Sequence, residues 1–181
     1  VDAIVHSWPS GAKILLSLHK LLFVTKNLSD RESILKQFLR YVAEFATSNG
    51  YHLLTYTNHT DQTFANDTAR LCGKGAKPAL AGRNHLLPEE LIYMFSKVDF
   101  VIASQMHACM FAYLASVPFV SLPYAEKVTE FNTLVGNDNI LQIEEMANPE
   151  KVAKCLLAAA NAKPLPQSQT IRKRASELFD I

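Results

Sequence analysis

The 181-residue sequence predicts an α/β fold, a Rossmann-like parallel sheet flanked by helices. Short apolar runs alternate with segments whose apolar residues recur at helical spacing, which is typical of right-handed βαβ units. Apolar residues make up 49% of the chain and charged residues 19%, as in an ordinary globular domain. The expected strands are residues 21–25, 51–56, 80–81, 100–103, 119–122 and 140–143. The expected helices are residues 30–48, 61–71, 88–97, 108–116, 126–134, 149–160 and 169–179.

The first two strand–helix units follow one another closely. Residues 21–25 are a continuous apolar run, which is typical of a strand buried on both faces. Ser29 or Asp30 then caps a helix whose apolar residues lie at helical spacing until Gly50 ends it. Residues 51–56 form the next strand, and a short helix and a glycine-containing loop come after it.

The later elements are marked by prolines and glycines. Pro88 suits the first turn of a helix, and the two glutamates directly after it lie where the helix dipole favours acids. Residues 100–103 are a clear strand, and Pro118 closes the helix that follows it. Gly136 ends the next helix, and Pro149 starts an alanine-rich one.

The chain divides into three predicted parts. Residues 1–19 are ambiguous, and we assign them to an N-terminal extension or the remnant of an interdomain linker. Residues 20–163 form the Rossmann-like C-terminal domain, and residues 164–181 form a C-terminal helix beyond a proline-containing break. Because the chain opens abruptly at Val1, we expect it to belong to a longer protein.

Composition and charge limit the classes of partner. The net charge of +1 gives no bulk electrostatic reason to expect a nucleic acid or an anionic membrane. No run reaches the roughly 20 apolar residues that span a bilayer, and the N-terminus does not resemble a secretory signal. We expect a cytoplasmic location, with the Golgi or another secretory compartment as the alternative. The three cysteines are far apart and no cluster of metal ligands is visible, so we expect reduced thiols and no metal.

One strand-to-helix turn carries the candidate chemistry. Ser104, Gln105, Met106 and His107 follow the strand at 100–103, and ligands of open parallel sheets bind beyond the C-terminal ends of the strands. The backbone amides near Met106 could hold a carboxylate or a phosphate. His107 could act as a cationic donor or deliver a proton, because the reference pKa of an imidazole is about 6.5. The alternative is a histidine that merely caps the helix or is solvated.

The surrounding segment, residues 98–136, resembles the signature of the polysaccharide pyruvyl transferase family. That signature is a strand, a turn ending in Arg-x-His-Ala, an apolar helix, Val-Pro, a second strand, and Tyr-x-x-Lys-Val followed by Phe and Gly. The matching residues are His107, Ala108, Val117, Pro118, Tyr124, Lys127, Val128, Phe131 and Gly136. Because their spacing is kept throughout, this resemblance is much more specific than a single histidine.

The resemblance implies an architecture and a reaction. Family members have two Rossmann-like domains that face each other, as in GT-B glycosyltransferases, with the active site between them. The chain would then be one half of such a GT-B-like architecture, completed by an N-terminal domain of the same protein. The family transfers a pyruvyl group from phosphoenolpyruvate to a sugar as a ketal, and its histidine is thought to act as the acid. The expected partners are therefore this small-molecule donor and a glycan acceptor, without a further cofactor.

The sequence departs from the family at one important position. The arginine before x-His is Gln105 here, and an amide can hydrogen-bond an oxyanion but brings no positive charge. Lys26 is the best candidate to supply the charge, because it follows the strand at 21–25, where the family often carries an arginine. Lys26 could equally be an exposed lysine at the end of a strand.

Further candidates lie near other strand ends. Tyr124 could offer its hydroxyl to the cleft or simply pack, and Lys127 could face the same cleft or be solvated. Asn58 and His59 follow the strand at 51–56, again on the ligand-side edge. The predicted catalytic residue is His107, and the predicted substrate-binding residues are Lys26, Gln105, Met106, Ser104, Tyr124, Lys127, Asn58 and His59.

Two functions of other classes stay open at this point. A GT-B glycosyltransferase would bind a nucleotide-sugar through this half, with helix N-termini holding the diphosphate. A non-catalytic module that binds sugar phosphates or serves assembly would explain Gln105, because such a module needs no strong grip on a donor.

Overall fold

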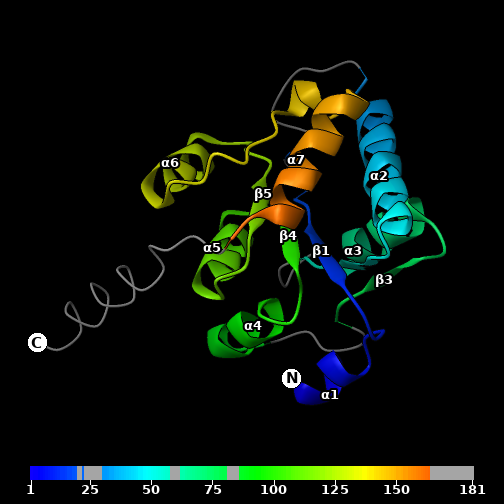
Figure 1. Cartoon of the computed structure of the whole chain (residues 1–181), viewed down its shortest axis with the longest axis vertical. Helices are drawn as coiled ribbons and strands as arrows, with labels where there is room; N and C mark the ends of the chain where they lie inside the picture. The colour runs from blue at the N-terminus through cyan, green and yellow to red at the C-terminus, as the bar shows by residue number, and fades with distance from the viewer. Residues whose placement is uncertain (20–21, 23–29, 58–61, 81–85, 164–181) are drawn as a thin grey trace, which may run out of the picture.

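The computed structural model describes residues 1–19, 22, 30–57, 62–80 and 86–163, and its framework is a five-stranded parallel sheet (Figure 1). The strands are β1 (Lys13–Ser17), β2 (His52–Thr55), β3 (Ala76–Pro78), β4 (Phe100–Ala103) and β5 (Phe119–Ser121). Their order in the sheet is β3-β2-β1-β4-β5, and each neighbouring pair is parallel. This sheet, with helices on both faces, confirms the predicted Rossmann-like α/β fold.

The central strand β1 lies earlier in the chain than the sequence predicted. Ile14 pairs with Leu53 of β2 on one side and with Phe100 of β4 on the other. The strand expected at 21–25 falls outside the described residues, apart from the buried Leu22. Two short apolar runs compete for the role of first strand in this sequence, and the length and periodicity of a run do not decide between them.

Residues before β1 also belong to the domain. Trp8 is only 8% exposed, and its indole Nε1 donates a hydrogen bond of 3.0 Å to the carbonyl of Ala79. The prediction that residues 1–19 form an extension or a linker remnant is therefore wrong. This segment supplies the middle strand of the sheet and a buried tryptophan, so it is an integral part of the core.

The remaining strands agree with prediction to different degrees. β2, β4 and β5 lie at or within the ranges predicted for them. β3 precedes the strand expected at 80–81. The strand expected at 140–143 reduces to a single bridge between Ile140 and Ser121, followed by a 3₁₀ turn, η2 (Ile143–Glu145).

Seven helices are present in the described parts of the chain. They are α1 (Asp2–His6), α2 (Arg31–Ser48), α3 (Gln62–Cys72), α4 (Pro88–Phe95), α5 (Met106–Leu114), α6 (Glu126–Val135) and α7 (Pro149–Asn161). None of these helices is long and apolar enough to cross a membrane. α5 starts at Met106 instead of the predicted Ala108, which brings the candidate turn directly against the helix. The helix expected at 169–179 lies outside the described residues.

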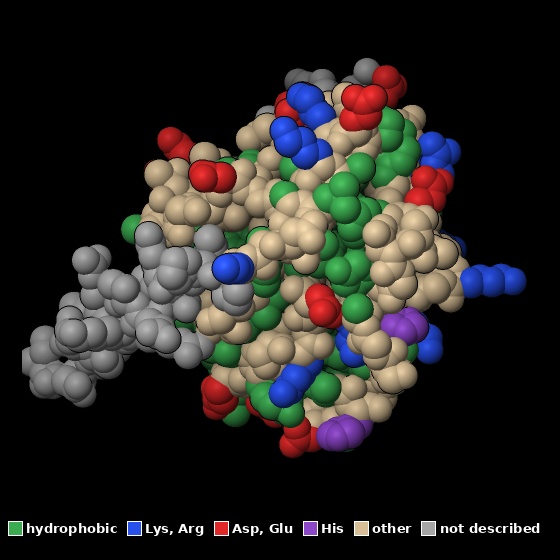
Figure 2. Space-filling model, viewed as in Figure 1, with side chains coloured by type: hydrophobic (Ala, Val, Ile, Leu, Met, Phe, Trp, Pro, Cys, Tyr) green, Lys and Arg blue, Asp and Glu red, His purple; other side chains and the backbone are tan. Residues whose placement is uncertain are grey.

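Two apolar layers cover the two faces of the sheet. Side chains of a strand point alternately to either face, so Ile14 and Leu16 of β1 enter one layer and Leu15 the other. The first layer is filled from α2 and α7, which lie side by side in Figure 1. The second is filled mainly from α4 and α5. On the face drawn in Figure 2 acidic and basic side chains are interspersed, in keeping with the small net charge.

Candidate active site

The sheet has a topological switch point between β1 and β4. From β1 the chain proceeds outward to β2 and β3 on one side, and then crosses to β4 and β5 on the other. In open α/β sheets the crevice at the carboxyl ends of the strands, where the order reverses, is the usual place for a ligand. The residues that follow β1 and β4 therefore define the candidate site.

Hydrogen bonds tie the ends of these two strands together. The Ser104 N–H donates to the Ser17 carbonyl at 2.9 Å, and the His19 backbone N–H donates to the Ser104 hydroxyl oxygen at 2.7 Å. Ser17 and Ser104 are both fully buried. The Ser104 side chain thus fixes the turn after β1, and this contact places His19 at the switch point.

Gln105 is buried at the carboxyl end of β4. Its side chain is 8% exposed, and its Oε1 accepts a long hydrogen bond of 3.4 Å from the Ser17 hydroxyl. Gln105 is the N-cap residue of α5, yet its side chain makes no capping hydrogen bond. A neutral amide suits this position because a buried charge without a partner would be costly.

The first turn of α5 presents backbone N–H groups beside Gln105 that the helix itself does not use. The first hydrogen bond of the helix runs from the Cys109 N–H to the Gln105 carbonyl at 3.1 Å, so the helix itself does not use the N–H groups of Met106, His107 and Ala108. With the dipole of the helix they favour an anion. Met106 is half-buried and His107 is exposed, which leaves the imidazole accessible at the carboxyl edge of the sheet.

Tyr124 and Lys127 approach the same edge from β5. Tyr124 is half-buried and its ring is stacked on the imidazole of His19, with centroids 5.3 Å apart and planes inclined by 6°. Lys127 is exposed on the first turn of α6. Buried Asn132 holds α6 to β5, because its Nδ2 donates to the Ser121 hydroxyl oxygen at 2.7 Å.

The structure adds one residue that the sequence did not point to. The prediction of Lys26 rests on the strand expected at 21–25, but the first strand is β1 and the first basic side chain after it is His19. His19 follows closely after the apolar run that forms β1. Because the sequence predicts the first strand at 21–25, it does not indicate that His19 lies near the end of a strand. Lys26, Asn58 and His59 lie outside the described residues.

Cys109 lies on α5 behind the site but is no nucleophile. It is fully buried, and burial raises the pKa of its thiol to about 12. A thiol of this kind stays protonated near neutral pH. Cys109 is thus a small buried residue of the core, whereas Cys155 is half-buried.

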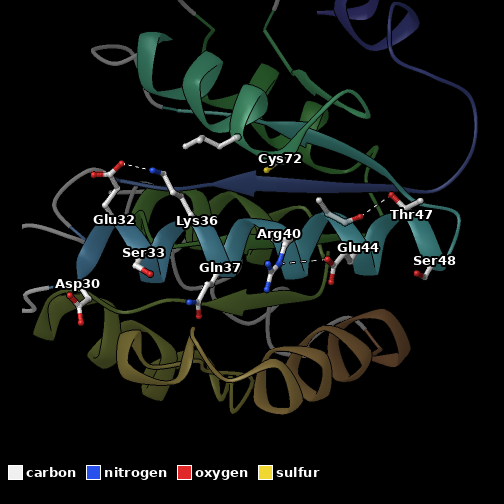
Figure 3. Close-up of a pocket in the computed structure, with 12 residues that line it drawn as sticks. Asp30, Glu32, Ser33, Lys36, Gln37, Arg40, Glu44, Thr47, Ser48 and Cys72 are labelled. Carbon is white, nitrogen blue, oxygen red and sulfur yellow. Dashed lines mark hydrogen bonds and ion pairs between the residues drawn. The ribbon is translucent and has the colours of Figure 1, made fainter.

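Two sizeable hollows lie elsewhere on the domain. One of about 990 Å³ runs along α2 (Figure 3), where Lys36 pairs with Glu32 at 2.6 Å and Arg40 with Glu44 at 3.7 Å. These exposed pairs are ordinary ion pairs of a solvated helix face. A second of about 580 Å³ lies between α7 and the start of β5. None of the predicted site residues that the structure describes lines either hollow.

Comparison with known families bears on this edge of the sheet. A profile of the polysaccharide pyruvyl transferase family matches residues 17–126, which is more than half of the chain. The chain belongs to this family. The matched range runs from the end of β1 to the first residue of α6, so it contains His19, Gln105, His107 and Tyr124. No curated protein matches the chain.

Solved structures resemble the chain in fold. A protein of Listeria monocytogenes assigned as a UDP-N-acetylglucosamine 2-epimerase has a TM-score of 0.54 at 14% identity, over 98% of this chain and 48% of its own. The spinosyn rhamnosyltransferase SpnG has a TM-score of 0.51 at 11% identity, over 96% of this chain and 47% of its own. The fold is therefore a Rossmann-like half of a GT-B-like architecture. The chain spans about half the length of these structures.

Proposed function

We propose that the protein containing this chain transfers a pyruvyl group from phosphoenolpyruvate to a sugar of a cell-surface polysaccharide or glycan. Family membership carries this proposal. The placement of the family's histidine supports it, because His107 is exposed on the first turn of α5, beside the switch point of the sheet. The proposed location is the cytoplasm, with a secretory compartment as the alternative.

In the proposed reaction His107 acts as the acid. It gives a proton to the methylene carbon of phosphoenolpyruvate, and the central carbon becomes electrophilic. One sugar hydroxyl adds to that carbon and a second displaces the phosphate, which leaves with its bonding electron pair. Two C–O bonds form, one C–O bond to phosphate breaks, and the two hydroxyl protons pass to His107 and to the phosphate. The products are a cyclic ketal and inorganic phosphate.

The donor anions need partners at the same edge. The N–H groups of Met106, His107 and Ala108 would hold the carboxylate or the phosphate, and the Gln105 amide would add a neutral hydrogen bond. Positive charge would come from His19 and Lys127, with Lys26 as a further candidate. Ser104 is fully buried and bonded to the turn after β1, so its part is to shape the crevice.

The acceptor side belongs to the rest of the proposed architecture. Because the chain spans about half the length of the structures that it resembles, we propose that an N-terminal domain of the same protein closes the cleft over this edge. Tyr124, Asn58 and His59 would line the cleft from this half. No cofactor besides the donor is required.

The test is the loss of transfer in a His107→Ala variant of the full-length protein. We expect the rate of phosphate release from phosphoenolpyruvate, with a galactose- or mannose-type acceptor, to fall by about 100-fold or more, as for removal of a general acid. His6→Ala is the matched control, since His6 is an exposed histidine on α1, away from the carboxyl edge. Full activity of the His107→Ala variant, with the fold retained by circular dichroism, would contradict the assigned role.

A nucleotide-sugar is the second candidate ligand. It is favoured by the neutral Gln105 beside the free N–H groups of α5, since a diphosphate can bind a helix N-terminus without a cationic partner. Calorimetry of the full-length protein with phosphoenolpyruvate and with UDP-sugars decides between the two. Tight binding of the UDP-sugar alone would reject the pyruvyl transferase proposal, and no binding of either would favour a non-catalytic module.

A further inference from the structure

We infer that Tyr124 is a positioning residue whose ring holds the His19 imidazole at the mouth of the crevice. His19 can then present a cationic N–H to an anionic group of the donor. This inference rests on the proposed function and deepens it, because it assigns the Tyr124 ring a different task from the expected one of offering a hydroxyl to the substrate.

The contact spans the end of the central part of the sheet. His19 follows β1 and Tyr124 follows β5, and β4 lies between these two strands. The stacked pair, with centroids 5.3 Å apart, therefore bridges the carboxyl end of β4, from which Gln105 and the first turn of α5 emerge. The pair lies where a ligand of the switch point would bind.

The backbone and the ring of His19 are fixed by different partners. The backbone N–H donates to the Ser104 hydroxyl oxygen at 2.7 Å, which fixes the main chain of His19. The Tyr124 ring, inclined by 6° to the imidazole, stacks on its face and restricts its rotation out of that plane. A protonated imidazole is also attracted to the negative face of an aromatic ring.

A positioned imidazole matters because Gln105 brings no charge. The described charged and titratable side chains at this edge include His19, His107, Tyr124, Glu126, Lys127, Asp30 and Glu32. Of these, Glu126 and Lys127 are exposed on α6 and Asp30 is exposed before α2, whereas His19 is half-buried at the switch point and bonded to Ser104. Among the described side chains, an ordered His19 is thus the one best placed to balance the charge of a bound carboxylate or phosphate.

Two substitutions of Tyr124 separate the ring from the hydroxyl. In the full-length protein, we expect Tyr124→Phe to keep the dissociation constant for phosphoenolpyruvate within about twofold, because the stacking face remains. Tyr124→Leu should weaken binding roughly two- to fivefold, the range of an exposed cation–π contact. Tyr124→Met serves as a second variant without a ring, should the leucine variant not fold.

A double-mutant cycle with His19→Ala tests the coupling. We expect His19→Ala alone to weaken phosphoenolpyruvate binding by about tenfold or more, as for loss of a charge-assisted hydrogen bond. Tyr124→Leu should then cause no further loss in the His19→Ala background, because the ring acts through the imidazole.

The outcomes distinguish this inference from the proposed function. Equal weakening by Tyr124→Leu with and without His19, or equal weakening by Tyr124→Phe and Tyr124→Leu, would overturn the positioning role while leaving the pyruvyl transferase proposal standing. Failure of the unsubstituted protein to bind phosphoenolpyruvate would overturn both. In the free protein, the proton shifts of the His19 ring should show the upfield ring current of Tyr124 in the Phe variant and lose it in the Leu variant.

Discussion

At the scale of single residues, the environment of Gln105 is the main difference from the family. The side chain is 8% exposed and bonded only weakly to Ser17, at 3.4 Å. The neutral Gln105 amide brings no positive charge to the site. The positive potential that an anionic donor needs must therefore come from other residues. Among the described residues, the fold places there the stacked imidazole of His19 and the N–H groups of the first turn of α5.

Restoring the family's arginine should strengthen the grip on the donor and weaken the fold. For Gln105→Arg we expect binding of phosphoenolpyruvate to tighten by about tenfold, because a guanidinium makes charge-assisted, two-pronged bonds. The longer charged side chain should lower the free energy of unfolding by about 1–3 kcal/mol, as for overpacking of a filled site. Calorimetry and urea denaturation measure the two effects. Gln105→Glu, of nearly equal size, is the control and should weaken binding, and equal affinities of the three proteins would contradict the placement of Gln105 at the donor.

At the scale of elements, the segment before β1 packs into the core and contributes to the stability of the domain. Trp8 is buried and bonded to the carbonyl of Ala79, so Trp8→Ala should lower the free energy of unfolding by about 3–5 kcal/mol, the usual cost of truncating a large buried ring. Trp8→Phe keeps most of the packing and should cost less. Urea denaturation followed by circular dichroism measures both. A Trp8→Ala protein as stable as the parent would mean that this segment is, after all, an extension.

The elements also show what the sequence could and could not predict. The β4–α5 turn was predicted because a continuous apolar strand is followed at once by a helix, and this turn brought in Ser104, Gln105 and His107. β1 was misplaced because two apolar runs of similar length lie near the start of the chain. The contact between His19 and Tyr124 could not be predicted, because it depends on the order of β1, β4 and β5 across the sheet.

At the scale of the whole molecule, buried acids with raised pKa values should make the fold sensitive to alkali. Burial raises the pKa of Tyr56 and of Cys109 to about 12 each, from ordinary values of 10.0 and 9.0. Between about pH 9 and pH 11 the unfolded chain therefore binds fewer protons than the folded one, so stability falls as pH rises. The stability that these two groups contribute is fully present below their pKa values in the unfolded chain. It is lost progressively as the pH rises to about 12.

Urea denaturation at several alkaline pH values checks this expectation. Each of the two groups contributes a slope of up to about 1.4 kcal/mol per pH unit in that window. Tyr56→Phe and Cys109→Ala should each flatten the dependence, since each removes one titrating group. If the double variant loses stability with pH as steeply as the parent, other groups dominate the alkaline transition.

The short edge strands of the sheet disfavour aggregation by strand pairing between molecules. On one rim of the sheet, β3 has only three residues and ends in Pro78, which has no N–H to donate, and Lys77 adds a charge. On the other, the Ser121 N–H and carbonyl of β5 are already bonded to Asn139 and Leu141 at 3.0 Å each. Neither edge strand presents a long row of unpaired backbone groups to a β-strand of another molecule. The sheet is therefore protected against edge-to-edge aggregation.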